Sequence, residues 1–175
     1  VIINRFDHRT SGNTHGHHSA SAILSVESFT KTNDPNVFPE QLSLVEPWQV
    51  KRQFFNTSWW FYGSQEKFNA ADKTNLISFQ TGVYYASIGK SNQEIAALSR
   101  SRHQSQGFGS TGSRGEETEY LEQINGDILK GKKSIFEGID TSWNRVKGGR
   151  AVGELLNKVI DNFDFKNPSA SIFDL

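Results

Sequence analysis

The sequence lacks cysteine and methionine altogether among its 175 residues, and it carries no excess of either charge. The missing cysteine excludes a disulfide scaffold. Its 19 basic and 19 acidic side chains cancel, so bulk charge does not direct the chain toward nucleic acid or an anionic membrane. No run of about 18 apolar residues is present to span a membrane. What remains is the composition of one ordinary folded domain, long enough to bury a core.

The absence of methionine also bears on the N-terminus. The chain opens with Val1-Ile2-Ile3, an apolar run typical of the interior of a β-strand rather than of the start of a protein. We therefore expect a single domain over residues 1–175 that is a piece of a longer protein.

The apolar periodicities predict mixed α and β structure. The predicted strands cover residues 1–6, 50–57 and 76–85, and the predicted helices cover residues 19–31, 92–106 and 151–163. Ser19 is expected to cap the first helix. We expect Ile95 and Leu98 of the second helix to face inward, and the apolar stripe of the third helix to pack in the core.

The most informative segment runs from Thr14 to His18 and holds three of the chain's five histidines. Neutral imidazole is a good ligand for zinc and other first-row ions, and a catalytic zinc needs about three protein ligands plus a water. A histidine cluster at the mouth of a helix therefore predicts a metal site, with a solvated turn as the alternative. His8 and His103 are distant in sequence, so further ligands would be carboxylates or lie outside this chain.

Two other segments leave alternatives open. Trp59 to Tyr62 are four consecutive aromatic residues, which indicate either core packing or a surface that stacks on sugar rings or on a partner. The loop from Gly107 to Gly115 contains four glycines near Arg100, Arg102 and Arg114. It indicates either a turn after a helix or a cradle for phosphate, although neither a Walker pattern nor a dinucleotide fingerprint is present.

Two stretches in this order resemble a known family. The first is the run from His15 to Ala20, which opens a helix, and the second is Gly89-Lys90-Ser91 followed by the segment from Ile95 to Gly109 with its His-Gln-Ser-Gln element. They resemble the C-terminal half of the PIG-L/LmbE-type de-N-acetylases, typified by N-acetylglucosaminyl-phosphatidylinositol deacetylase. The resemblance is best over residues 1–121, and residues 122–175 form a looser helical extension.

The resemblance implies a fold, an activity and a set of site residues. The fold is the C-terminal portion of a Rossmann-like, three-layer α/β domain with a mixed sheet and flanking helices. The activity is a metal-dependent hydrolysis that removes an acetyl group from an N-acetylglucosamine-type or other N-acetyl substrate. His18 matches a metal ligand for Zn²⁺ or another divalent ion. His15 matches the histidine that stabilises the oxyanion or protonates the leaving amine, and His103 either orients the site or packs.

The sequence departs from that family in two places. Family members carry His-Pro-Asp-His where this chain has Gly16 and His17 in the middle, so the carboxylate that tunes the first histidine is absent. The His-Pro-Asp-Asp element, which supplies two metal ligands and the general base, is also absent. We therefore expect the chain alone to be inactive and to bind zinc weakly, with an N-terminal segment of the same protein supplying the rest.

The expected ligand is a small N-acetylated sugar or glycoconjugate, with no nucleic acid and no membrane span. One alternative is a noncatalytic carbohydrate-binding or scaffold module that uses the aromatic residues from Trp59 to Tyr62. Another is a phosphate-bearing ligand held by the arginines around the glycine-rich loop, although the zero net charge argues against nucleic acid.

Overall fold

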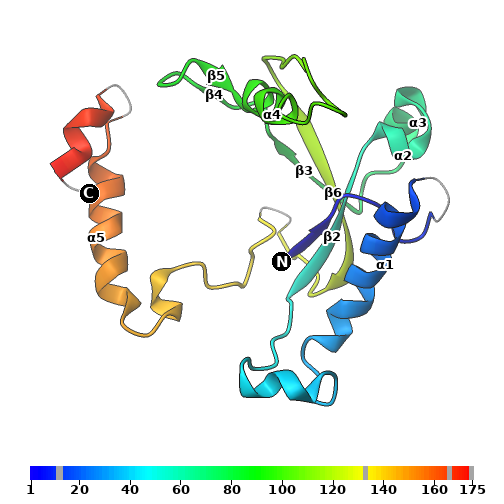
Figure 1. Ribbon diagram of the computed structural model, residues 1–175. Coiled ribbons are helices and arrows are strands. Elements are labelled where there is room, and N and C mark those ends of the chain that lie inside the picture. The colour runs from blue at the N-terminus through cyan, green and yellow to red at the C-terminus, as the bar shows by residue number, and fades with distance from the viewer. Residues whose placement is uncertain (11–13, 132–133, 165–166, 174–175) are drawn as a thin grey trace. The chain divides into compact units, whose positions relative to one another are not determined.

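The computed structural model describes residues 1–10, 14–131, 134–164 and 167–173 (Figure 1). The chain divides into two compact units, each of which is described by itself. Unit 1 comprises Val1–Thr81 and Glu117–Glu137, and unit 2 comprises Gly82–Glu116 and Gly138–Leu175. Helices and strands alternate along the chain, so the predicted α/β class is confirmed.

Unit 1 is built on a mixed four-stranded sheet in the order β1-β2-β6-β3. Its strands are β1 (Ile2–Asn4), β2 (Arg52–Thr57), β3 (Leu76–Gln80) and β6 (Thr118–Gly126). β1 and β2 run parallel, whereas β6 runs antiparallel to both β2 and β3. The expected mixed sheet with flanking helices is therefore present.

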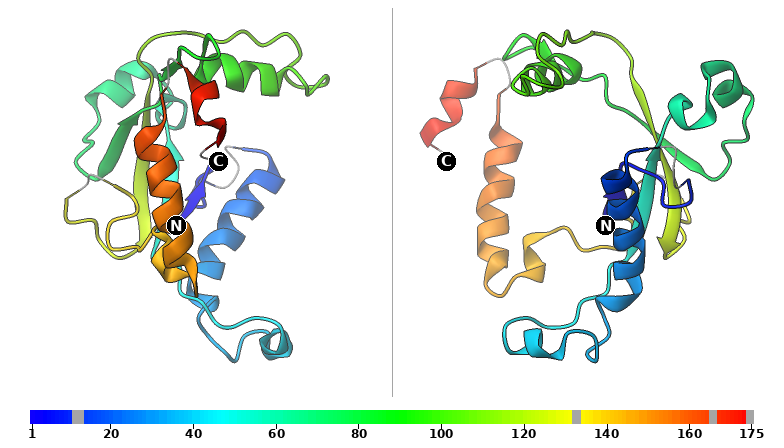
Figure 2. Two further views of the ribbon diagram at one scale, coloured as in Figure 1. Left: turned by 90° about the vertical axis from the view of Figure 1, so that its left-hand side faces the viewer. Right: turned by 45° about the vertical axis from the view of Figure 1, so that its right-hand side comes forward.

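The helices of unit 1 follow the strands in sequence. They are α1 (Gly16–Lys31), a 3₁₀ helix (Pro39–Ser43), α2 (Trp59–Tyr62) and α3 (Gln65–Ala70). Because α1 connects the parallel strands β1 and β2, the three elements form a βαβ unit. Figures 1 and 2 show α1 lying alongside the sheet. The segment before α1 leaves the sheet at the carboxyl end of β1.

The two faces of this sheet are packed differently, because neighbouring residues of a strand point to opposite sides. One face carries an apolar core of Phe54, Ile77, Leu121 and Leu129. On the face toward α1, apolar residues such as Ala22 and Phe29 are buried together with polar contacts. The amide of Gln53 donates to the hydroxyl of Ser25 at 2.8 Å, and Ser25 donates to Asn4 Oδ1 at 2.7 Å. These bonds fasten the middle of α1 to β1 and β2.

In the part of unit 2 that the structure describes, there are two short strands, two helices and two 3₁₀ helices. They are β4 (Tyr84–Tyr85), β5 (Lys90–Ser91), α4 (Asn92–Arg100), a 3₁₀ helix (Trp143–Arg145), α5 (Gly149–Asn162) and a 3₁₀ helix (Pro168–Phe173). β4 and β5 pair antiparallel. The start of α4 is a capping box, in which Ser91 Oγ accepts the Glu94 N–H at 3.1 Å and the Glu94 carboxylate accepts the Ser91 N–H at 2.8 Å.

The predicted start of the first helix was wrong. α1 begins at Gly16 with His15 as its N-cap, because the His15 carbonyl accepts the N–H groups of His18 and Ser19 at 2.9 and 3.2 Å. Ser19 is a buried residue of the first turn, and its Oγ lies 3.0 Å from Thr14 Oγ1. The helix therefore includes two of the three clustered histidines.

The strand predictions differ from the structure in two further ways. The strand predicted over residues 76–85 is divided: β3 ends at Gln80, opposite Thr118, and β4 pairs with β5 in a separate sheet. The strand β6 was not predicted, because Thr118–Gly126 alternates few apolar residues with charged ones. Its charges have partners across the sheet face, as shown for Glu122 below.

The predicted packing of two helices was wrong. α4 ends at Arg100 rather than Gln106, since the next amides make turn bonds such as His103 N–H to Arg100 O at 3.0 Å. Its buried residue is Ala97, whereas Leu98 is 54% exposed. α5 exists as predicted, but Leu155 and Ile160 on its apolar stripe are 67% and 68% exposed. Among the described residues, this stripe is not part of a core.

The helices were also compared with the requirements of a membrane span. Within the described ranges, no helix combines the length and the apolar character that crossing a bilayer requires.

Candidate metal site at the start of α1

Three histidines gather where α1 begins, beyond the carboxyl end of β1. His15 is the N-cap residue, and His17 and His18 lie in the first turn. The side chains of an N-cap residue and of the residue three positions later approach each other, as they do in a capping box. In open α/β sheets the carboxyl ends of parallel strands are also where ligands bind. The cluster therefore occupies a position that this type of fold commonly uses for function.

The geometry brings the three imidazoles close together. Their potential ligand nitrogens all lie within 4.8 Å of one another. The ring of His18 lies 4.1 Å from that of His17 and 5.5 Å from that of His15, between centroids. Two nitrogens on one tetrahedral zinc lie about 3.4 Å apart, given a Zn–N distance of about 2.1 Å. Side-chain movements of up to about 1.4 Å close this difference, so the three residues could hold a shared ion.

His18 is held in place by Phe6, the second residue after β1. Their rings stack with centroids 3.9 Å apart and planes only 9° from parallel. Desolvation, together with the positive charges of His17 and His15, lowers the pKa of His18 below its ordinary value of 6.5. The lowered pKa favours the neutral form of His18, which is the form that binds a metal.

A buried carboxylate fixes the segment that leads to the cluster. Asp7 is 7% exposed and accepts both the backbone N–H and the side-chain Nε–H of Arg9, each at 2.9 Å. Arg9 in turn donates to both oxygens of Glu122 on β6, at 2.9 and 2.7 Å. Burial alone would raise the pKa of Asp7, but the hydrogen bonds from Arg9 outweigh it and lower that pKa. Both carboxylates thus serve to hold the loop on the sheet.

The charge around the cluster is unfavourable for a cation. The first turn of α1 contains no acidic residue, and the group of potential ligands found among the described residues consists of histidines only. The N-terminus of a helix also carries a partial positive charge. Metal affinity at this position therefore depends strongly on anionic ligands added to the three imidazoles.

His103, the third predicted site residue, lies in unit 2. It is exposed and follows α4 in a turn. The cluster instead includes His17, for which the sequence suggested no defined role. Phe6, Arg9 and Glu122 were also missed. A stacking partner and a salt bridge across more than one hundred residues leave no local pattern in a sequence.

The aromatic segment from Trp59 to Tyr62 divides between packing and exposure. The ring of Phe61 packs edge-on against Phe55 at 4.7 Å, and the ring of Tyr62 packs against Phe68 at 5.0 Å. Trp59 and Trp60 are each 49% exposed. Because α2 follows β2 directly, this segment lies at the same edge of the sheet as the histidine cluster.

The glycine-rich loop packs against α4. A side chain at Gly112 would collide with the backbone of Glu94, and one at Gly107 would collide with Arg100. Arg114 pairs with Glu94 at 3.0 Å and lies over the ring of Tyr84 at 5.0 Å. Close packing therefore accounts for these two glycines, and Arg114 has an acidic partner.

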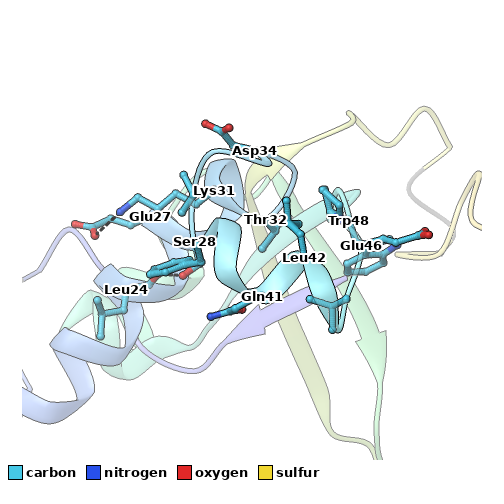
Figure 3. A pocket seen from close by; sticks show the side chains of 14 residues that line it. Leu24, Glu27, Ser28, Lys31, Thr32, Asp34, Gln41, Leu42, Glu46 and Trp48 are labelled. Atoms are coloured by element: carbon cyan, nitrogen blue, oxygen red, sulfur yellow. Dashed lines mark hydrogen bonds and ion pairs between the residues drawn. The ribbon is translucent and has the colours of Figure 1, made fainter.

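A groove lies at the C-terminal end of α1. This groove has a volume of about 420 Å³ and its apolar lining includes Leu24, Leu42, Val45 and Trp48 (Figure 3). The backbone of Phe38, which also lines it, has a positive φ of 57°. The search of the described residues finds no group of potential metal ligands in this groove.

Comparisons with protein-family models, with curated proteins and with solved structures give no match to this chain. The functional interpretation therefore depends on the residues of the site and on the resemblance described above.

Proposed function

We propose that His15, His17 and His18 form part of a divalent-metal site in a metal-dependent hydrolase. The observation that carries this proposal is the approach of three imidazoles to within 4.8 Å at the start of α1. Imidazole is the commonest metal ligand in proteins, and zinc sites with several histidines are well represented.

The architecture supports a Rossmann-like assignment. β1, α1 and β2 form a parallel βαβ unit, and the histidines follow the first of its strands. Ligands of doubly wound α/β folds bind at this edge. The antiparallel β6 is compatible with such a sheet, because many doubly wound folds carry an antiparallel strand.

Within the proposed site the residues have separate tasks. We assign metal binding to His18 and His17, which are neighbours on the first turn. Zn²⁺ or a similar ion, when bound, polarises a carbonyl group and lowers the pKa of a coordinated water. His15, exposed at the N-cap, is placed to donate a hydrogen bond to a substrate oxygen. His103 lies in unit 2, and the proposal gives it no part in metal binding.

The proposed substrate is an N-acetylated sugar or glycoconjugate, from which the enzyme releases acetate. This assignment comes from the resemblance to the PIG-L/LmbE de-N-acetylases. The general base and the anionic metal ligands of that family have no counterpart in this sequence, so the proposal places them outside this chain. The chain alone is accordingly expected to be inactive.

Calorimetric titration with zinc tests the metal site. We expect one ion to bind with a dissociation constant of about 1 µM or weaker, because the imidazoles at this positive helix end have no anionic ligand beside them among the described residues. His18→Ala should weaken binding about tenfold or more. His103→Ala is the control and should leave the affinity unchanged. Equal affinity in the wild type and His18→Ala would contradict the proposal.

A second candidate function is carbohydrate binding without catalysis. It is supported by Trp59 and Trp60, whose half-exposed indoles lie at the ligand-binding edge of the sheet. In that case a glycan should bind in the presence of a chelator, and Trp59→Ala or Trp60→Ala should abolish binding. Phe38→Ala, which removes an exposed aromatic ring elsewhere in unit 1, is the matched control.

A further inference from the structure

The groove at the C-terminal end of α1 gathers exposed apolar side chains around one hollow. Single apolar residues are normal on a protein surface, but a group of them rimmed by polar residues is typical of an interaction site. Figure 3 shows side chains of α1 on one side of the groove and Leu42 and Trp48 on the other. Five large apolar residues that line it are between 41% and 64% exposed: Leu24, Phe38, Leu42, Val45 and Trp48.

Phe38 adopts an unfavourable backbone conformation at this groove. Its φ of 57° and ψ of 52° lie in the left-handed region, which costs a residue with a side chain about 1–3 kcal/mol. Among the described residues, it is the one residue other than glycine with a positive φ. Its ring is also 59% exposed, although aromatic rings gain free energy from burial. Backbone strain of this kind is concentrated at ligand-binding and other functional positions, so Phe38 supports a binding role for the groove.

The charge around the groove favours a cation. Glu27, Asp34 and Glu46 contribute carboxylates to its lining, and Lys31 contributes a single ammonium group. Lys31 pairs with Glu27 at 3.7 Å, whereas Asp34 and Glu46 form no ion pair with any residue that the structure describes. The groove also lies at the C-terminal end of α1, where the last carbonyl groups carry a partial negative charge. A ligand with an apolar surface and positive charges therefore suits this groove.

The shape of the groove distinguishes between kinds of cationic ligand. Pockets for small molecules bury about 70–90% of the ligand surface, whereas the apolar residues here are open on about half of their surface. The groove therefore covers one side of its occupant. An extended peptide binds by adding a strand to a sheet edge, but the lining residues lie between Leu24 and Trp48, where the structure describes no strand. An amphipathic helix, in contrast, places one apolar face in a groove of this kind.

We propose that the groove binds an amphipathic helix of a partner protein, in which lysine or arginine residues border the apolar face. The apolar side chains of that helix contact Leu42, Val45 and Trp48, and its basic side chains lie beside Asp34 and Glu46. An anionic membrane surface also offers apolar contact, but the carboxylates of the groove repel it. The proposal is independent of the metal site, which lies at the other end of α1.

A synthetic helical peptide of leucine and lysine, with its leucines on one face, tests the inference. A length of about 15 residues is sufficient for a helix to form. Fluorescence anisotropy of the labelled peptide is followed as the whole chain is added. We expect saturable binding with a dissociation constant of about 10 µM, which weakens as salt is added. A peptide with glutamate in place of every lysine should bind about tenfold more weakly. Equal affinity of the two peptides, or no saturable binding of the lysine peptide, would overturn the proposal.

Glu46→Lys tests the contribution of charge at an exposed position, where folding should be unaffected. It should weaken binding of the lysine peptide about fivefold, because it reverses a charge beside the basic side chains of the helix. Glu40→Lys is the matched control, since Glu40 is exposed on the neighbouring 3₁₀ helix but does not line the groove. Its effect should be less than about twofold. Equal weakening in the two variants would show that binding follows net charge rather than the groove.

Leu42→Ala tests the apolar contact. Leu42 lines the groove and is 41% exposed, whereas Leu44 is 87% exposed and lies outside the lining. Leu42→Ala should weaken binding of the lysine peptide about fivefold, and Leu44→Ala should leave the affinity unchanged. Unchanged affinity in Leu42→Ala would mean that the peptide binds elsewhere on the chain.

Two further measurements test other occupants of the groove. The first is co-sedimentation of the chain with vesicles of phosphatidylcholine and phosphatidylserine in equal amounts. Vesicle binding that Leu42→Ala abolishes would overturn the proposal in favour of a membrane surface. The second is sedimentation equilibrium of the chain alone. A concentration-dependent dimer that Glu46→Lys dissociates would overturn the proposal in favour of a second copy of the chain.

Discussion

The two ends of α1 differ in chemistry although they belong to one helix about 24 Å long. At its N-terminal end, three imidazoles gather, and a buried polar network joins α1 to β1 and β2. At its C-terminal end, Phe29 is buried, and the groove beyond it exposes large apolar side chains such as Leu42 and Trp48. The same sheet supports both ends.

The two ends of α1 differ in what their side chains indicate about function. The N-terminal end carries three clustered imidazoles, which are good metal ligands, and this clustering is informative about a ligand. Exposed apolar side chains are common on protein surfaces and carry no such information individually. We therefore place the proposed metal site at the N-terminal end of α1 and expect the buried part of the C-terminal half to contribute mainly to stability.

The largest effect is expected from Phe29→Ala. Phe29 is 8% exposed on the C-terminal half of α1, so its truncation should destabilise unit 1 by about 3 kcal/mol. Urea unfolding measures the change. Leu24→Ala removes a side chain that is 61% exposed on the same helix and should change stability by less than about 0.5 kcal/mol. Similar losses in the free energy of unfolding of Phe29→Ala and Leu24→Ala would contradict the expectation that burial of Phe29 stabilises unit 1.

Asp7→Asn tests whether the hydrogen bonds between Asp7 and Arg9, in the segment before α1, stabilise the fold. Loss of the charged acceptor for Arg9 should destabilise the fold by about 2 kcal/mol at neutral pH. Because the folded-state pKa of Asp7 lies below the ordinary value of 3.8, its stabilisation is present above pH 3.8 and is lost as the pH falls further. Asp7→Asn should therefore flatten the acid limb of a stability–pH profile.

The control for that profile is Asp34→Asn, in an exposed loop near the other end of α1. It should keep the acid limb of the wild type. A wild-type acid limb in Asp7→Asn as well would mean that Arg9 does not hold Asp7 in solution.

Ser25→Ala should have a smaller effect, about 1.5 kcal/mol. The substitution leaves Gln53 Nε2 and Asn4 Oδ1 buried without partners, and such groups are costly. Thermal unfolding followed by circular dichroism gives the change. Ser28→Ala is one turn further along α1, where the hydroxyl bonds only to the backbone of Leu24, and should be nearly neutral. Equal destabilisation by Ser25→Ala and Ser28→Ala would show that the hydrogen bonds of Ser25 to Asn4 and Gln53 do not stabilise the fold.

The smallest effect is expected from Trp48→Ala in the groove. Trp48 is 64% exposed, so the free energy of unfolding should change by less than about 0.5 kcal/mol. The zinc affinity should be the same as in the wild type, because the groove lies at the opposite end of α1. A loss above about 1 kcal/mol would show that the groove is a structural part of unit 1.

Local sequence patterns predicted the elements whose apolar residues repeat regularly. The strand predicted over residues 50–57 is present as β2, with Phe54 and Phe55 buried, and the helix predicted over residues 19–31 is present because its apolar residues recur at helical spacing. The strand β6 was missed because its charged residues pair with Arg9 and Asn56, which lie far away in sequence. The exposure of the α5 stripe could not be predicted either, since periodicity identifies an apolar face but not its partner.

The candidate site could be predicted only in part for the same reason. The spacing of His15 and His18 is a local feature and was visible in the sequence. The inclusion of His17 depended on the start of α1, which the hydrogen bonds to the His15 carbonyl decide.

The central proposal is that the histidine cluster at the start of α1 binds one metal ion. The most direct test follows the imidazole ring resonances of all five histidines by ¹H–¹⁵N NMR while zinc is added. The account predicts that the signals of His15, His17 and His18 shift together and reach saturation at one equivalent of zinc, while those of His8 stay unchanged. Zinc-induced shifts at His8 alone, or no saturable shift within the cluster, would contradict it.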